Sequence, residues 1–568
     1  MNLFWSLAPE LIQKIGDEAR FQDLKRMRLV CKLFSVLFQR KIYHCFDINI
    51  GPFGYPSSFE NRGIQRRIDK LEALGREEHH PAKIFTKELR ISTVWPPTVK
   101  PYTTPTDEEV KLFLELLVPA LGSLKIISKL EWFNNLTVCD AVYSAVFECI
   151  KPMIPNLTSL KLSQIPTKIV GPTSKFNAPI LILTDPRLPL LVNLHIDCGG
   201  EDPNQTTLLS LLTALSKLLC NSRTTLRSFK CLIPVHILGS RMPTIQSLFN
   251  LGTNEYQDAA ITDFVTSPEF VRYVRSITPT IPHFKALQSL DLQAFGAYDS
   301  ELHLPYQRHT FDLWTVMANT GIQLRHIKSD VVTKGLVDYI SSYSGGLQEL
   351  SVKSYGEENA EQPGKDLFTR ALNFQHTSLR FLNVDSWDHK WHIFREELAT
   401  TGVFVGQLTF SSLEELQIPV FIDSTMENIS LQVLRGPTDG LPLDTKPNYI
   451  WILLGLVTQK ERFPSLKKVI ITARPPRFDP PEHPQDVELA FFKAATLRLC
   501  SYRFNSATPA TSCSPIPAVI ILFQDQAMRH EYTAVEISPG RWGYSSNSMR
   551  TYPDWDPEWE YSACTQAE

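Results

Sequence analysis

Hydrophobic residues recur along most of the chain in the phrase L-x-x-L-x-L, in which Ile, Val or an aromatic residue sometimes replaces Leu. Its apolar and polar positions alternate, which is the pattern of a β-strand with one buried face. In LTSLKL we expect Leu160 and Leu162 to point into a core and Lys161 to lie on the opposite face. The phrase begins at Ile127, Leu157, Leu191, Leu226, Leu287, Leu324, Leu347, Leu379, Leu413 and Leu466, with a weaker version at Leu89.

Successive phrases start 23 to 61 residues apart, which leaves room for one helix in each interval. Helical spacing of apolar residues is visible at 108–121, 206–219 and 331–343. A strand phrase and a helix repeated in this way are the signature of leucine-rich repeats. We therefore expect an α/β fold in which an irregular leucine-rich-repeat solenoid has a curved parallel sheet inside and helices outside.

The outward positions of these strands form a row that could bind a protein target. Their charges are mixed, so they predict no stripe that reads phosphates and no nucleic-acid partner. Because the row includes three lysines, an acidic or phosphorylated target is one possible partner. The alternative is that these residues are merely solvated on an exposed sheet face. The candidate target-binding residues are Lys161, His195, Lys230, Asp291, Lys328, Asn383 and Gln417.

The segment from Leu7 to Phe46 has a different pattern, because its apolar residues recur every three or four positions. Pro9 suits the first position of a helix, Gly16 loosens the end of that helix, and Asp23 is a good N-cap for the next one. This spacing predicts two or three short helices. A helical hairpin of forty residues has a marginal core, so we expect it to dock on a partner or on the rest of the chain.

These residues resemble an F-box, the motif that attaches substrate receptors to the Skp-type adaptor of cullin-RING ubiquitin ligases. One departure is that Ala8 stands where the family usually has proline, with Pro9 one place later. The resemblance rests on Leu7, Pro9, Glu10, Ile12 and Ile15, then Asp23-Leu24, Arg28-Leu29-Val30-Cys31-Lys32 and Phe34. It implies adaptor-binding roles for Leu7, Pro9, Glu10, Ile12, Ile15, Leu24, Leu29, Val30, Cys31 and Phe34.

The resemblance implies the substrate-recognition subunit of an SCF-type ligase. Its partners would be the Skp-type adaptor, through it a cullin scaffold, and an unknown protein target held by the repeats. A non-catalytic leucine-rich-repeat scaffold or adaptor outside ubiquitin ligation is the alternative, and an ordinary helical cap on a solenoid end would show the same apolar spacing.

Composition agrees with a folded chain that works inside the cell. Of the 568 residues, 43% are hydrophobic and 21% are charged, and the net charge of −3 predicts no general attraction to nucleic acid or membranes. The ten cysteines include no C-x-x-C pair, which favours the reducing cytoplasm or nucleus. No apolar stretch of 18 residues predicts a membrane span.

Catalytic signatures such as a P-loop, a G-x-S-x-G elbow or H-E-x-x-H do not occur in the sequence. The nearest cluster with metal-ligand spacing is Asp385 to His392, where His389 and His392 would share a helix face, and a polar turn is the other interpretation. We predict a non-catalytic chain with no cofactor and no metal.

The pattern divides the chain into five parts. Residues 1–46 form the helical hairpin, and 47–84 form a connector with one polar helix. Residues 85–475 form the solenoid, and 476–537 form a C-terminal cap that includes a helix near 487–499 and a strand at 518–523. Residues 538–568 form a tail.

Overall fold

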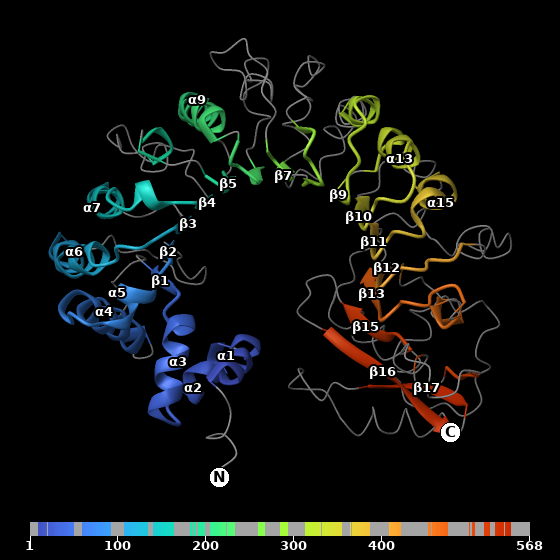
Figure 1. Ribbon diagram of the computed structural model, residues 1–568, viewed down its shortest axis with the longest axis horizontal. Coiled ribbons are helices and arrows are strands. Elements are labelled where there is room, and N and C mark those ends of the chain that lie inside the picture. Colours follow the sequence, from blue (N-terminus) through green and yellow to red (C-terminus); the bar gives the residue numbers. More distant parts are fainter. Residues whose placement is uncertain are drawn as a thin grey trace, which may run out of the picture. The chain divides into compact units, whose positions relative to one another are not determined.

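The chain divides into two compact units, Met1–Leu287 and Gln288–Glu568, and each unit has its own parallel strands (Figure 1). The computed structural model describes residues 9–19, 21–49, 60–92, 107–133, 140–163, 182–185, 187–188, 191–198, 205–222, 224–232, 260–266, 284–293, 313–330, 332–354, 364, 366–386, 408–421, 453–455, 457–459, 461–474, 499, 502–505, 516–522, 529–538 and 540–546.

The first unit begins with three short helices, after which helices and strands alternate. The helices are α1 (Pro9–Glu18), α2 (Phe21–Met27), α3 (Lys32–Ile42), α4 (Glu60–Arg76), α5 (Pro81–Phe85), α6 (Asp107–Gly122), α7 (Asp140–Ile150), the 3-10 helix η2 (Ile154–Asn156) and α9 (Gln205–Ser222). The strands are β1 (Cys45–Asn49), β2 (Glu88–Ser92), β3 (Lys129–Phe133), β4 (Ser159–Ser163), β5 (Asn193–Asp197), β6 (Ser228–Leu232) and β7 (Asp263–Thr266). Each strand from β1 to β7 pairs in parallel with the next.

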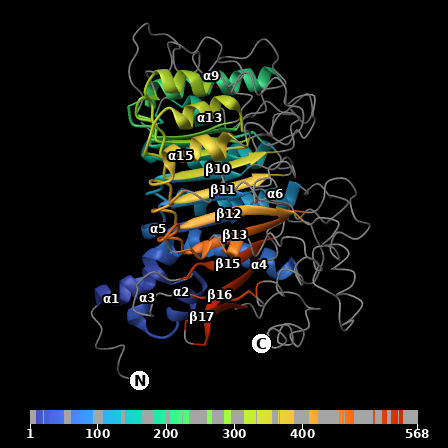
Figure 2. The ribbon, with the colours of Figure 1, turned by 90° about the vertical axis from the view of Figure 1, so that its right-hand side faces the viewer.

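The second unit continues the same pattern and then changes to antiparallel pairing (Figure 2). Its strands are β8 (Ser289–Leu292), β9 (His326–Ser329), β10 (Glu349–Ser354), β11 (Phe381–Ser386), β12 (Glu415–Phe421), β13 (Lys468–Arg474), β14 (Phe504–Asn505), β15 (Ala518–Leu522), β16 (Arg529–Ser538) and β17 (Arg541–Ser546). Its helices include α13 (Lys334–Ser341), the π-helix η5 (Leu367–Ala371) and α15 (Leu372–Gln375). Strands β8 to β13 and then β15 pair in parallel, and β16, β17 and β14 follow in antiparallel pairs.

Every L-x-x-L-x-L phrase forms a strand that begins two residues after its first position, and the weaker phrase at Leu89 forms β2. The expected mixed α/β class is confirmed, as are the helices near 108–121, 206–219 and 331–343. The 61-residue interval after Leu226 contains one more strand, β7, which begins two residues after Ile261. Phe264 takes the buried place of the second leucine there, and the polar residues around it obscured the phrase.

The alternation within each strand separates a core face from an open face. Leu160 and Leu162 are fully buried on β4, whereas Lys161 between them is only half-buried. In each unit the helices lie along one side of the strands (Figure 1), and Leu117 of α6 and Leu215 of α9 contribute buried side chains to that side. Burial of alternate apolar residues between strand and helix is therefore the main stabilising term in each repeat.

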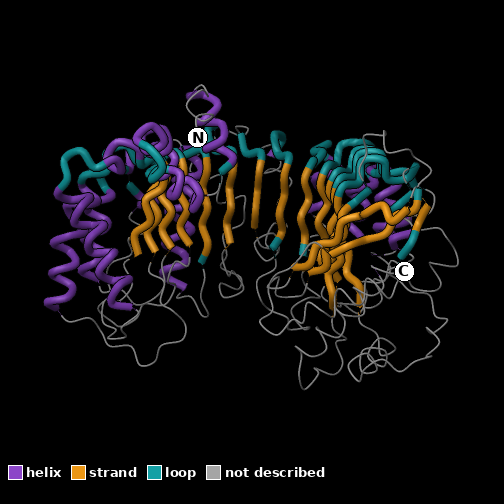
Figure 3. The backbone as a smooth tube through the Cα atoms, turned by 90° about the horizontal axis from the view of Figure 1, so that it is seen from below, coloured by secondary structure: helices purple, strands orange, loops and turns teal. Residues whose placement is uncertain are grey.

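A regular hydrogen-bond pattern joins successive repeats just before each strand. The carbonyl oxygen of His44 accepts the N–H groups of Lys87 (3.0 Å) and Glu88 (3.1 Å), so one carbonyl holds two consecutive amides of the next repeat. The same double acceptance recurs at the carbonyls of Lys87, Ser128, Thr158, Val192, Arg227, Gln288, Arg325, Gln348, Arg380 and Glu414. This pattern fixes the register of the strands, which run side by side in Figure 3.

In the second unit one buried glutamine holds the turn that leads from α13 to β10. Gln375 is fully buried, and its Nε2 donates to the carbonyls of Ile340 (3.0 Å) and Tyr343 (2.6 Å). Its Oε1 accepts the N–H groups of Gly346 (3.3 Å) and Leu347 (3.2 Å). One amide side chain therefore satisfies four backbone groups, in three buried hydrogen bonds and one partly buried one.

Two expected boundaries are wrong. The sheet begins at β1, inside the segment expected to be hairpin and connector, because Cys45–Asn49 pairs with β2. The polar helix of the connector is present as α4, but Leu71 and Leu74 are buried, so it is part of the folded unit. The C-terminal cap includes the predicted strand β15 and extends through β17 into the expected tail. Most of the expected helix near 487–499 lies outside the described residues.

Candidate functional site

The N-terminal hairpin has a small core of its own. Ile12 of α1, Leu24 of α2, and Phe34, Phe38 and Ile42 of α3 are all buried together. The rings of Phe34 and Phe38 lie 5.5 Å apart at 48°, a favourable tilted arrangement. These residues bring the three helices together and leave the opposite sides of α1 and α3 free of that core.

A glycine allows α1 and α3 to approach closely. A Cβ atom at Gly16 would collide with the buried ring of Phe38. Lys41 of α3 also donates through Nζ to the carbonyl oxygen of Gly16 at 2.7 Å. Gly16 was expected to loosen the end of the first helix, but α1 continues through it to Glu18, and the glycine is needed for packing.

The turn between α2 and α3 places two apolar side chains in solvent. Three backbone hydrogen bonds of 3.0 Å, from the N–H groups of Arg28, Leu29 and Val30, close the end of α2. Cys31 is extended, and its Sγ accepts the N–H of Phe34 at 3.5 Å, which starts α3. Leu29 is 80% exposed and Val30 is 71% exposed.

The exposed apolar side chains continue from this turn onto α3. Val36 is 64% exposed and Leu33 is 38% exposed, and they lie three residues apart on one side of the helix. We call Leu29, Val30, Leu33 and Val36 the docking surface. Leu11 and Ile15, one turn apart on α1, are a further exposed apolar pair. Exposed apolar clusters on a folded chain mark sites of interaction.

The ten residues expected at the adaptor interface fall into three groups. Glu10, Ile15, Leu29 and Val30 are exposed, and Cys31 is half-buried. Ile12, Leu24 and Phe34 are buried in the hairpin core, so they support the surface instead of forming it. Leu7 and the side chain of Pro9 lie outside the described residues. Sequence reasoning missed Leu11, Leu33 and Val36, because apolar spacing in a three-helix cluster does not reveal which side of a helix is covered.

The hairpin is joined directly to the first strand. Only Tyr43 and His44 separate α3 from β1. The carbonyl oxygen of Tyr43 accepts a hydrogen bond from Oγ1 of the buried Thr86 at 2.8 Å. The phenol hydroxyl of Tyr43 accepts a hydrogen bond from Arg28 Nη1 at 2.9 Å. The rings of Tyr43 and His80 pack in a T-shaped arrangement, with their centroids 5.6 Å apart. The orientation of the hairpin on the sheet is thereby fixed.

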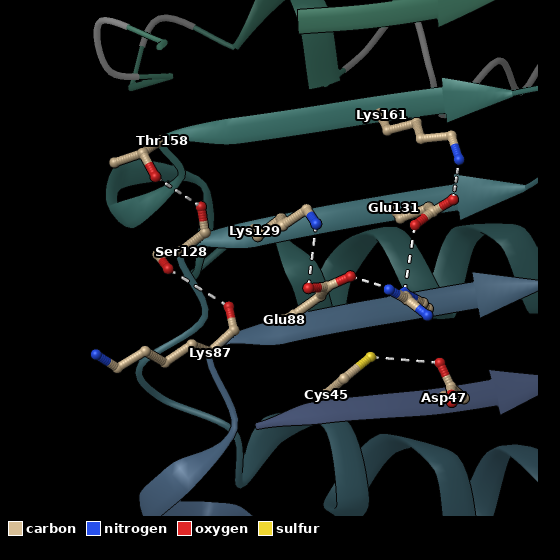
Figure 4. Close-up of polar contacts among 10 residues, drawn as sticks. Cys45, Asp47, Lys87, Glu88, Ser128, Lys129, Glu131, Thr158 and Lys161 are labelled. Carbon is tan, nitrogen blue, oxygen red and sulfur yellow. Dashed lines mark hydrogen bonds and ion pairs between the residues drawn. The ribbon is translucent and has the colours of Figure 1, made fainter. Parts of the chain in front are cut away.

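The open sheet face of the first unit has a chain of ion pairs across β2, β3 and β4 (Figure 4). Arg90 contacts Glu88 at 2.7 Å and Glu131 at 3.3 Å, Lys129 contacts Glu88 at 3.1 Å, and Lys161 pairs with Glu131. Burial opposes ionisation of Glu88, but hydrogen bonds from Lys129 and Arg90 outweigh it and hold the Glu88 pKa below its ordinary value. Lys161 is therefore already engaged by a carboxylate of its own sheet.

Beyond β4, the described residues of the first unit do not continue this chain of ion pairs. Strand register places Lys161 beside His195 and His195 beside Lys230. Burial, together with the charges of Lys230 and Lys161, lowers the pKa of His195 to about 3, so the imidazole is neutral at physiological pH. Its Nε2 is buried, with no hydrogen-bond partner among the residues that the structure describes. Burial also raises the pKa of Asp197 at the end of β5.

The middle row on the open face of the second unit has two charged and three neutral side chains. Register aligns Asp291, Lys328, Ser351, Asn383 and Gln417 in one row across β8 to β12. Lys328 pairs with Asp291 at 3.5 Å, and Asn383 Nδ2 donates to Ser351 Oγ at 3.0 Å. The structure thus brings the candidate target-binding residues together as two aligned rows, one in each unit.

The groups considered for chemistry do not form a site in the described part of the chain. No cluster of three or more His, Cys, Asp or Glu side chains that could hold a metal is found there, and His389 and His392 lie outside it. His80, which follows Glu77, Glu78 and His79 in the sequence, serves as the N-cap of α5, where its Nδ1 accepts the N–H of Ala82 at 3.2 Å. Burial raises the pKa of the Cys45 thiol to about 12, with help from the neighbouring Asp47, so this thiol stays protonated.

Comparison with known proteins adds no relative. No family model matches the chain, and no curated protein matches it. Among the described helices, none is both long enough and apolar enough to cross a bilayer.

Proposed function

We propose that this chain is the substrate-recognition subunit of an SCF-type cullin-RING ubiquitin ligase. The hairpin would bind a Skp-type adaptor, and the open faces of the repeat sheets would bind a target protein. The observation that carries the proposal is the exposure of Leu29 and Val30, because the F-box-like phrase places two bare apolar side chains at the turn of a hairpin that already has a closed core.

Burial of this surface supplies a plausible driving force. Covering an exposed Leu or Val side chain contributes roughly 1.5–3 kcal/mol. Full burial of Leu29 and Val30 therefore corresponds to about 3–6 kcal/mol before the costs of association. In isolation such exposed side chains stabilise nothing, so their presence favours a partner that covers them.

The proposed target surface is not a general phosphate reader. Lys161 and Lys328, two of the three lysines in the rows, form ion pairs with Glu131 and Asp291. An acidic or phosphorylated target would have to displace these carboxylates, which makes Lys230 the lysine best placed to meet one. The mixed composition of the rows favours a folded protein surface with both polar and charged contacts.

The proposed role is geometric and requires no acid or base from this chain. A receptor that holds adaptor and target together raises the effective concentration of a target lysine near the ubiquitin-conjugating enzyme. The Tyr43 junction supports this role, because Thr86, which lies just before β2, donates a hydrogen bond to the Tyr43 carbonyl and so ties the end of the hairpin to the sheet. Motion between the two would lower that effective concentration.

The test is co-purification of the full chain with a Skp-type adaptor. Replacing Leu29→Asp and Val30→Asp puts two charges into the proposed interface, which should weaken binding by about 3 kcal/mol or more, at least roughly a hundred-fold in Kd. The matched control is Val118→Asp with Ile126→Asp, because these side chains are 44% and 43% exposed in the same unit and lie outside the hairpin.

We expect stable binding by the wild type and the control and none by the hairpin variant, with all three folded by circular dichroism. Failure of the folded wild type to bind would refute the proposal. Equal loss in the control would show that the docking surface is not responsible. Binding without ubiquitin transfer to any target would favour a scaffold outside ubiquitin ligation.

A further inference from the structure

The docking surface lies in a basic part of the chain. Residues 9–43 contain eight Lys or Arg and four Asp or Glu, a net charge of +4, whereas the whole chain carries −3 and the remainder therefore −7. Among the described side chains of the hairpin, the exposed basic residues are Lys14, Lys25, Arg26, Lys32 and Arg40. Charge of this sign concentrated around exposed apolar residues is unusual for a chain that is acidic overall.

The basic residues flank the apolar turn. Lys25 and Arg26 precede Leu29 and Val30, and Lys32 follows them as the first residue of α3. Arg26 contacts the carboxylate of Asp23 at 3.8 Å with both side chains largely in solvent, so this ion pair compensates its charge weakly. The surface thus has an apolar centre between cationic positions.

Lys32 is placed against the electrostatic preference of its own helix. The start of an α-helix has a partial positive charge that favours anions, and α3 has no acidic residue in its first turn. No ion pair of Lys32 is found in the part of the chain that the structure describes. A lysine there is unfavourable for the free hairpin, and a carboxylate brought by a partner would offset this.

We propose that the partner of the docking surface presents an apolar groove with an acidic rim. Asp or Glu side chains of that rim would lie next to Lys32 and Arg26 while the groove covers Leu29, Val30 and Val36. The inference rests on the proposed function, because it names the chemistry of the adaptor surface that would bind there. Bare apolar side chains between the cations favour a protein over a nucleic acid, which would face a continuous basic stripe.

The experiment measures the Kd of the full chain for a purified Skp-type adaptor from about 50 to about 500 mM NaCl, because the screening of surface charges rises strongly over this range. The wild type should bind more weakly as salt rises. Lys32→Glu should weaken binding by about five- to ten-fold at low salt and flatten the salt dependence, since a rim charge acts mainly through steering and screening. Lys217→Glu, an exposed lysine on α9, should change neither quantity.

The Lys32→Glu variant separates interface charge from folding. Glutamate in the first turn of α3 suits the helix dipole, so hydrogen exchange of the hairpin should be unchanged or slower while adaptor affinity falls. A variant that merely unfolds would show faster exchange. The specific expectation for Lys32→Glu is weaker adaptor binding together with unchanged or slower hydrogen exchange of the hairpin.

The outcomes distinguish the two proposals. Adaptor binding that is independent of salt, with Lys32→Glu within about two-fold of the wild type, would overturn the acidic-rim inference and leave the proposed function standing. No adaptor binding by the folded wild type at any salt would overturn both. Lys32-dependent binding to heparin or anionic vesicles, with none to the adaptor, would show that the basic charge serves a different class of partner and would also overturn the inference.

Discussion

Substitution Gly16→Ala is expected to destabilise the hairpin, which is the reverse of the usual effect of this change in a helix. Alanine normally stabilises a helix interior by about 0.5–1 kcal/mol relative to glycine. At position 16, however, the new Cβ would collide with the Phe38 ring, which is 2% exposed and packed in the hairpin core. Overpacking of this kind costs about 1–3 kcal/mol.

The two effects combine to a net loss of roughly 0.5–2 kcal/mol in the local stability of the hairpin. Hydrogen–deuterium exchange of α1 and α3 amides in the full chain measures that stability directly, because these helices open as a local unit. A loss of this size corresponds to about two- to thirty-fold faster exchange.

Two controls make the argument specific. Gly75→Ala in α4 should slow exchange, because the nearest atom to its new Cβ, on Pro119, lies at an ordinary contact distance of 3.4 Å. Adding Phe38→Leu to Gly16→Ala should recover part of the loss, since a smaller side chain relieves the collision. Slower exchange in Gly16→Ala alone would refute the close-packing role of this glycine.

Two further predictions concern buried polar groups. Gln375→Leu should destabilise the second unit by about 3 kcal/mol or more, measured by urea unfolding, because it removes the partner of three buried backbone groups and one partly buried one. A loss below about 1 kcal/mol would contradict this. The His195 pKa is lowered to about 3, so the unfolded chain binds more protons than the folded chain between its ordinary value of 6.5 and 3. Stability of the first unit should therefore fall as pH drops through this window, and His195→Gln should flatten the dependence; an unchanged slope in the variant would contradict the assignment.

The strands could be predicted from the sequence, and the reason is local. Alternation of apolar and polar residues records which side of a strand is buried, so Leu160 and Leu162 identified β4 and its core face without knowledge of any neighbour. Strand β7 was not predicted, because Asp263 and Thr266 surround Phe264 with polar residues. Its pairing with β6 shows that it belongs to the sheet.

The hairpin surface could be predicted only in part. The resemblance to an F-box selected Leu29 and Val30, which are exposed, but it also selected Ile12, Leu24 and Phe34, which are buried in the hairpin core. Each helix here has apolar residues on more than one side, so local spacing alone does not distinguish core from surface. Packing of the three helices against each other makes that distinction.

By itself the sequence determined the placement of most of the repeat strands, the sides that they bury and the existence of a helical hairpin, because these depend on contacts between residues close in the chain. Tertiary structure decided which apolar residues of the hairpin remain exposed, and which charged residues of the sheet neutralise each other. Strand register places Lys161 beside Glu131, with which it forms an ion pair, and places His195 beside Lys161. Register is set by hydrogen bonds between repeats about thirty residues apart, which no local pattern encodes.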